Sequence, residues 1–152
     1  MTTESLVPGV PSVYLEKNEG SMPDNAVCLA HQNDAGPLYL GVADSPELGR
    51  IPGKVFEGVC YYPYGGEEQS TSDFYWVCAS SEVGLHPAGS APKRALATGF
   101  QTQGGGVCYH VIANTPHGTI PGKTNAASTC AYYSHGGAEH CADDYSYVVW
   151  KK

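Results

Sequence analysis

The chain has 152 residues, of which 41% are hydrophobic and 15% are charged, and its formal net charge is −7. This composition is typical of a folded domain, and the acidic balance disfavours nucleic-acid binding and adsorption to anionic membranes. No apolar run approaches the roughly eighteen residues of a membrane-spanning helix, so we expect no membrane insertion. The 19 Gly, 11 Pro and 11 Tyr residues favour short strands joined by tight turns.

The N-terminal segment, MTTESLVPGVPSVY, lacks the basic and apolar regions of a signal peptide. We therefore expect a cytoplasmic protein, or one secreted by a non-classical route. Six cysteines are present without Cys-x-x-Cys spacing: Cys28, Cys60, Cys78, Cys108, Cys130 and Cys141. Reduced, buried thiols are the expectation for a cytosolic chain, and disulfides stay open for a protein that leaves the cell.

In chain order, alternating apolar residues predict strands at 26–30, 38–43, 59–64, 74–78, 95–100 and 145–150. Turn residues separate these segments at intervals of about eight to twelve residues, a spacing typical of a sandwich or barrel. Pro52-Gly53 and Pro121-Gly122 are interpreted as type II turns. The Gly-Gly pairs at 65–66 and 136–137 are interpreted as hairpin turns. No helix of useful length is predicted.

The same ordered motifs occur twice along the chain. RIPGKVFEGVCYYPYGGEE at 50–68 is followed by TIPGKTNAASTCAYYSHGGAE at 119–139, which aligns Cys60 with Cys130 and Tyr62 with Tyr132. Two copies are too few for a solenoid. The prediction is one all-β domain over residues 1–152, a pseudo-two-fold β-sandwich or barrel-like fold built from two tandem repeats of about 70 residues. The repeats are expected at 14–78 and 83–150.

Three pairs of polar side chains recur at equivalent positions: Lys54 with Lys123, Gln32 with Gln101, and Glu68 with Glu139. A lysine offers donors and a glutamine offers both donors and an acceptor, so the set suits a neutral polyhydroxyl ligand. The glutamates either contact such a ligand or close each unit as partners of the lysines. Recurrence of these residues therefore predicts one binding site in each repeat.

The order Gly-x-x-Pro-x-x-Ala, a Tyr-containing strand, Pro-Gly-Lys, Cys-Tyr-x-Pro-Tyr-Gly-Gly-x-Glu and a terminal aromatic strand resembles the DM-nine repeat. The resemblance covers about residues 14 to 150. The chain is similar to the two-repeat mannose-binding lectins of oysters, which act in innate recognition. The resemblance implies a carbohydrate-binding homodimer that takes mannose or mannose-containing glycans, with one site per repeat and no cofactor.

The resemblance also implies roles for individual residues. In such lectins the lysine of Pro-Gly-Lys and an acidic residue on the preceding hairpin bond sugar hydroxyls, so Lys54 and Lys123 are the lysines. The acidic position falls on Gln32 and Gln101, and Asp34 is close enough to be the acceptor in the first repeat.

Other functions are weighed against the lectin. A glycoside hydrolase would use Glu68 and Glu139 as its carboxylate pair, but it needs unlike environments where equivalent repeats supply like ones, so no enzyme is predicted. His135 and His140 flank a Gly-Gly pair that breaks the helix of a two-histidine zinc motif, so no metal site is predicted and they are interpreted as exposed loop residues. A protein-interaction module with tyrosine-rich strands at its interface stays the alternative.

Overall fold

The computed structural model describes residues 2–103 and 105–151 and confirms the all-β prediction. The described residues contain no helix that could cross a membrane. The strands of the first half are β1 (Thr3–Val7), β2 (Val10–Lys17), β3 (Cys28–Gln32), β4 (Gly36–Ser45), β5 (Gly49–Phe56), β6 (Val59–Tyr64), β7 (Glu67–Thr71) and β8 (Phe74–Ala79). Those of the second half are β9 (Val83–Pro87), β10 (Gly99–Gln101), β11 (Gly106–Thr115), β12 (Gly118–Thr124), β13 (Ala131–His135), β14 (Ala138–Ala142) and β15 (Tyr145–Trp150).

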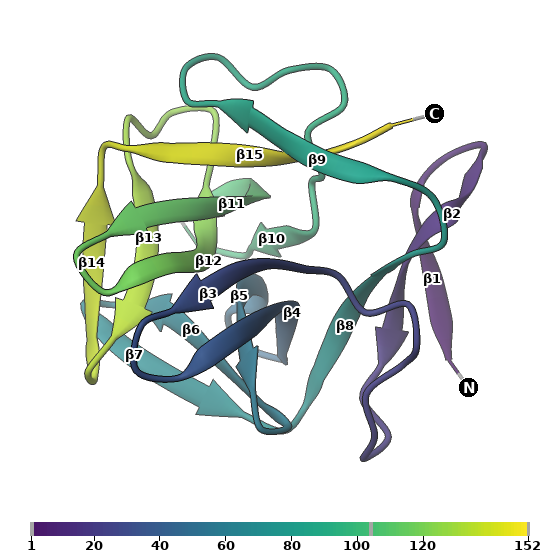
Figure 1. Cartoon of the computed structure of the whole chain (residues 1–152), viewed down its shortest axis with the longest axis horizontal. Helices are drawn as coiled ribbons and strands as arrows, with labels where there is room; N and C mark the ends of the chain where they lie inside the picture. The colour runs from purple at the N-terminus through teal and green to yellow at the C-terminus, as the bar shows by residue number, and fades with distance from the viewer. Residues whose placement is uncertain (1, 104, 152) are drawn as a thin grey trace.

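The strand pairing is duplicated. In the first half β4 pairs with β3, β5 and β8, and in the second half β11 pairs with β10, β12 and β15. The halves join through equivalent contacts, β3 with β12 and β10 with β5, and through β7 with β14. The β4–β5 pairing closes an eight-stranded ring that runs β4-β3-β12-β13-β14-β7-β6-β5. Figure 1 shows the second half packed on the first, with the β1–β2 hairpin at one side.

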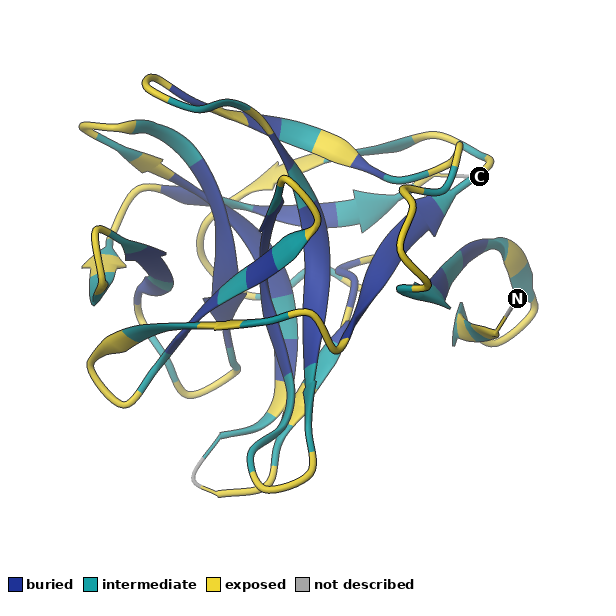
Figure 2. Ribbon diagram, turned by 90° about the horizontal axis from the view of Figure 1, so that it is seen from below, coloured by how far each residue is buried: buried dark blue, intermediate teal, exposed yellow. Residues whose placement is uncertain are grey.

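The core lies between the strands of both halves. Alternate residues of β4 and β11, such as Leu40, Val42 and Val111, have no exposed surface, and Figure 2 shows burial concentrated in the strands with exposure at the turns. Burying such side chains contributes about 1.5 to 3 kcal/mol each. The alternation of apolar residues in the sequence therefore corresponds to the strand faces that point into the core.

The prediction of type II turns at the Pro-Gly pairs is wrong. Pro52 and Gly53 lie inside β5, and Pro121 and Gly122 lie inside β12. On one edge, β5 pairs with β10 only as far as Arg50 and with β6 only from Lys54 onward. The proline, which has no N–H to donate, therefore occupies the gap between two neighbouring strands, where no ladder hydrogen bond is lost.

The glycine after each proline is required by a close backbone approach. A Cβ atom on Gly53 would lie 2.4 Å from the Tyr61 oxygen, and one on Gly122 would lie 2.2 Å from the Tyr132 oxygen. Both distances are far below contact distance. Only glycine at these positions therefore allows β6 to lie against β5, and β13 to lie against β12. The repeated Pro-Gly-Lys motif is thus part of a strand, and its close packing fixes the position of the lysine.

The register corrects the alignment of the repeats by one residue. Lys54 pairs with Tyr61 and Lys123 pairs with Tyr132, so these two tyrosines are equivalent. Tyr62 is therefore not the counterpart of Tyr132, and the cysteine match at 60 and 130 is coincidental. The loop between β12 and β13 is longer than the β5–β6 turn, and this insertion displaces the second copy.

Two further strand and turn predictions have opposite outcomes. The hairpin turns at 65–66 and 136–137 are confirmed, since all four glycines have positive φ between 61° and 86°, as a type I′ turn requires. The strand predicted at 95–100 is wrong over most of its length, because β10 begins at Gly99. Ala95 and Leu96 instead bond to β15, and Thr98 turns its hydroxyl to the buried ring of His110.

Candidate functional site

The first cavity has a volume of about 270 Å³ and brings together the predicted residues of the first repeat: Gln32, Asp34, Lys54 and Glu68. Lys54 Nζ donates to Gln32 Oε1 at 3.3 Å and to the Ser134 carbonyl oxygen at 2.8 Å, and it pairs with Glu68 Oε2 at 3.3 Å. Gln32 Nε2 donates to Asp34 Oδ1 at 2.7 Å. The three donors of the ammonium group are therefore all directed at protein oxygens.

The second cavity, of about 460 Å³, contains the equivalent set Gln101, Lys123 and Glu139. Lys123 Nζ donates to Gln101 Oε1 at 2.6 Å, lies 3.9 Å from Glu139 Oε2 and stands 5.0 Å from the centre of the Tyr64 ring. A 3.9 Å separation is an ion pair but too long for a hydrogen bond. Lys123 therefore keeps more donor capacity for a ligand than Lys54 does.

Each cavity is completed by the other repeat. The β13–β14 hairpin brings His135 and Gly136 to the first cavity, and the β6–β7 hairpin brings Tyr64 and Gly65 to the second. The glutamates hold these tips in place. Glu68 Oε1 accepts from the Gly137 N–H at 3.1 Å, and Glu139 Oε1 accepts from the Gly66 N–H at 3.0 Å. The glutamates thus close the turns of the opposite repeat and also pair with the lysine of their own.

Burial and charge act against each other in both cavities. Burial lowers the pKa of Lys54 and of Lys123, while Glu68 and Glu139 respectively oppose the shift. Burial alone would raise the pKa of Glu68, but Ser134, Lys54 and the Gly137 N–H together hold it below its ordinary value. Both lysines are only 6% exposed. Each ammonium is therefore a buried, paired charge that still borders open space.

The wall of the first cavity includes His135, which belongs to a stacked pair of histidines. His135 stacks on His117 with ring centres 3.8 Å apart and planes inclined by 12°. Burial, His117 and Lys54 lower the pKa of His135, so its ring is favoured in the neutral state. The hydrogen bond from Gln32 lowers the pKa of the Asp34 carboxyl. A flat neutral ring and an ionised acceptor thus flank the first lysine.

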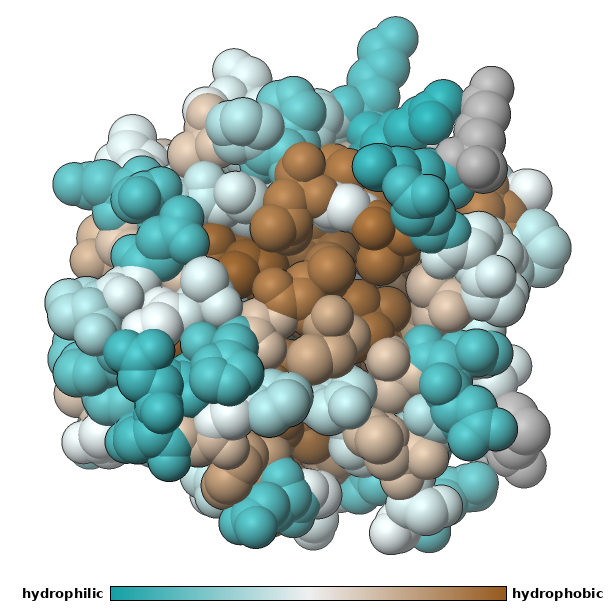
Figure 3. Space-filling model, viewed as in Figure 1, coloured by the Kyte–Doolittle hydropathy of each residue, from teal (hydrophilic) through white to brown (hydrophobic). Residues whose placement is uncertain are grey.

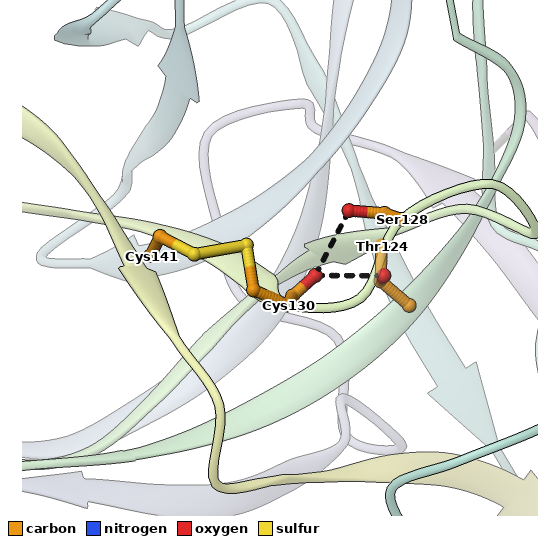
Figure 4. The surroundings of a disulfide bond; sticks show 4 residues. All are labelled: Thr124, Ser128, Cys130 and Cys141. Carbon is orange, nitrogen blue, oxygen red and sulfur yellow. Dashed lines mark hydrogen bonds between the residues drawn. A yellow bond between two sulfur atoms is a disulfide. The ribbon is translucent and has the colours of Figure 1, made fainter.

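The second cavity has a covalently tied wall. Asn125, Ala127 and Ser128 of the β12–β13 loop line it. Cys130, which ends this loop, is bonded to Cys141, so the expectation of free thiols is wrong for these two residues. Figure 4 shows the Cys130 carbonyl oxygen accepting from Thr124 Oγ1 at 2.9 Å and from Ser128 Oγ at 3.2 Å. The other cysteines, at 28, 60, 78 and 108, are free.

The structure brings together the residues that the repeats predicted, but not the two glutamates with each other. The carboxylates of Glu68 and Glu139 face different cavities, each with its own lysine. The contributions of Tyr64 and His135, which precede the two Gly-Gly pairs, were not predicted from the sequence. His135, interpreted as an exposed loop residue, lines a cavity. Both residues directly precede a Gly-Gly pair, and this shared position was the signal in the sequence. Nothing within either repeat shows that its hairpin tip lines the cavity of the other repeat.

A profile of the DM9 repeat matches residues 45–142, close to two thirds of the chain. The chain belongs to the DM9 repeat family. The match begins in the first predicted repeat and ends in the second, so it includes the two lysines and both glutamates. A search of curated proteins finds no match.

The DM9 fold also has a structural relative among solved structures. The nematode sperm cell motility protein MFP2B superposes with a TM-score of 0.61 at 15% sequence identity. The alignment covers 91% of this chain and 44% of the nematode protein, so this chain spans less than half of that protein's length. At such low identity the likeness supports the fold alone.

Proposed function

We propose that this DM9 protein is a lectin that binds mannose-type glycans at one site per repeat, in glycan or microbe recognition. The observation that carries the proposal is the pair of equivalent cavities, each with a lysine, a glutamine, a glutamate and a tyrosine at its surface. Ammonium and carboxamide donors beside carboxylate acceptors match the alternating hydroxyls of a sugar, and an aromatic ring matches its apolar face. The resemblance to mannose-binding oyster lectins gives the glycan class.

The buried ion pairs bear directly on this proposal. A lysine fully consumed by internal partners, with no space beside it, would have no role in binding. Here Lys123 has one short hydrogen bond and a distant carboxylate, and both lysines border a cavity. The two 3.3 Å contacts of Lys54 are longer than a typical hydrogen bond, so a sugar hydroxyl can replace one of them at small cost.

Calorimetric titration with mannose tests the proposal. Removing a lysine alone would leave a buried carboxylate unpaired, so each site is neutralised as a pair, by Lys54→Met with Glu68→Gln and by Lys123→Met with Glu139→Gln. We expect binding of two sugars to the natural chain, one to each double variant and none to the quadruple variant. Undiminished binding by a folded quadruple variant would refute the proposal.

A charge-matched control separates site effects from general electrostatics. Lys151→Met with Glu82→Gln removes an exposed ion pair, with Nζ and Oε1 2.9 Å apart, that lies outside both cavities. We expect this variant to bind mannose like the natural chain. Circular dichroism of each variant checks that the fold is kept.

The Cys130–Cys141 disulfide favours action in an oxidising environment, and we therefore propose a role outside the cytoplasm. Binding at each single site is expected to be weak, so a homodimer would gain avidity by doubling the sites. Sedimentation of the purified protein measures this assembly, and a monomer at micromolar concentration would contradict it.

A protein-interaction module is the second candidate. Figure 3 shows an apolar area in the middle of one face, surrounded by polar side chains. Contiguous apolar surface of this kind marks interaction sites in many proteins. A glycan array separates the two functions, because a chain that only binds proteins gives no signal on any glycan.

A further inference from the structure

The first cavity is small for a ligand site, and a larger groove lies beside it. Its volume of about 270 Å³ lies just below the roughly 300 to 1,000 Å³ of most small-molecule sites. A second hollow of about 540 Å³ adjoins it and shares two lining residues with it, Ala35 and Phe56. We propose that these two hollows form one extended site, in which a sugar beside Lys54 continues into a second sugar seated in the groove.

The lining of the groove suits a pyranose ring. Its lining includes Tyr39, whose ring meets the buried ring of Trp76 edge to face with centres 6.3 Å apart, and Met22, which is 49% exposed. Aromatic faces take the C–H side of a sugar, while polar groups at the edge take its hydroxyls. Asn18 on the rim accepts from the Trp76 indole N–H at 3.2 Å and thereby fixes that ring.

Glu57 supplies an acceptor to the groove in an unusual backbone conformation. It is the one non-glycine residue with positive φ in the described part of the chain, at 50°, and it lines the groove beside Gly58. A type I′ turn at this place favours Asn, Asp or Gly, and a glutamate here is strained. The exposed carboxylate at a strained position indicates a functional demand that outweighs the local preference.

The second site is not extended in this way. The position equivalent to Phe56 is Asn125, and the tight turn at Glu57 and Gly58 is replaced by the longer loop that lines the second cavity. The Cys130–Cys141 bond ties that loop to β14. The two repeats therefore differ in the length of glycan they accept, the first taking a disaccharide or longer chain and the second a terminal sugar.

The test rests on the proposed function and reads the first site alone. The second site is first removed by Lys123→Met with Glu139→Gln, and methyl mannoside and a mannose disaccharide are then titrated by calorimetry. We expect the disaccharide to bind about tenfold more tightly, since one added hydrogen bond to a charged group has about that effect. Glu57→Gly should remove this gain without changing the affinity for methyl mannoside.

A loss of disaccharide affinity in Glu57→Gly cannot be explained by a weakened fold, because this variant should be more stable than the chain it is made from. Glycine relieves the positive φ, so the melting temperature should rise by about 2 to 4 °C while disaccharide affinity falls. Glu47→Gln, which removes an exposed carboxylate outside the groove, is the charge control and should change neither. Equal affinity for both sugars, or a gain that survives Glu57→Gly, overturns the extended site alone. If the chain with Lys123→Met and Glu139→Gln binds neither sugar, the proposed function is overturned as well.

Discussion

Acidification is expected to destabilise the fold through His110, a fully buried residue of β11. Its Nε2 lies 2.9 Å from the Gly53 carbonyl oxygen and its Nδ1 lies 2.9 Å from Thr98 Oγ1. Because a carbonyl oxygen only accepts, Nε2 carries the proton and Nδ1 accepts from the threonine hydroxyl. Burial lowers the pKa of His110 from 6.5 to about 4. The native ring is therefore neutral where an unfolded histidine becomes charged.

The sign and size of the effect follow from this difference. Below pH 6.5 the unfolded chain binds a proton that the native chain does not, so the free energy of unfolding falls as the pH falls. Each pH unit costs about 1.4 kcal/mol, which gives about 2 kcal/mol between pH 7.5 and 5. The carboxyls of Glu4 and Glu68, whose pKa values are lowered, contribute only at lower pH. Burial also lowers the pKa of His135, which adds a loss of stability of the same sign, so a variant is needed to isolate His110.

His110→Leu is that variant, because Leu40 occupies the equivalent position of the first repeat. Urea unfolding followed by tryptophan fluorescence at several pH values gives the free energy of unfolding of both chains. The variant should be less stable at pH 7.5, since Gly53 and Thr98 lose their partner. Its loss of stability between pH 7.5 and 5 should be smaller than that of the natural chain by about 2 kcal/mol. An unchanged pH dependence would refute a neutral buried ring.

Two further predictions concern stability. Gly53→Ala places a methyl group 2.4 Å from a backbone oxygen of β6 and should cost at least about 3 kcal/mol in urea unfolding. Gly84→Ala meets only a flexible lysine side chain and should be neutral within about 0.5 kcal/mol, so similar losses would count against the close-approach argument. Replacing Cys130 and Cys141 by serine, which opens a loop with a sequence separation of 11, should cost about 3 kcal/mol. It should weaken sugar binding at the second cavity only, and equal weakening at both would contradict the assignment of the loop.

The residues that line the two cavities were predictable because repetition carries information that a single copy lacks. One lysine beside a turn is ordinary, whereas Lys54 and Lys123 at equivalent positions predicted equivalent environments, and the structure places each in a cavity with its own glutamine and glutamate. The Pro-Gly pairs misled because local turn rules ignore neighbours. Pro52 is tolerated inside β5 only because two other strands leave a gap beside it.

Features that depend on strand pairing between distant residues could not be predicted from local sequence patterns. Tyr64 and His135 reach the opposite cavity because β7 pairs with β14. The Cys130–Cys141 bond likewise depends on the β13–β14 hairpin, in which Tyr132 faces Cys141 and brings the preceding cysteine alongside. Spacing alone gives no reason to choose this pair among six cysteines. Long-range register, rather than residue type, decides these contacts.

The crossing hairpins also explain why both the lysine and the glutamate are duplicated. The Glu68 N–H donates to the Gly137 carbonyl oxygen at 3.0 Å, and the Glu139 N–H donates to the Gly66 carbonyl oxygen at 3.1 Å. Each glutamate thus fixes the opposite turn through both its backbone and its side chain, and its remaining carboxylate oxygen faces the lysine of its own repeat. A change in one glutamate therefore loosens the hairpin tip that the other repeat contributes to the cavity in which that glutamate lies. Because each cavity is lined by residues from both repeats, duplication produced two sites that neither repeat completes alone.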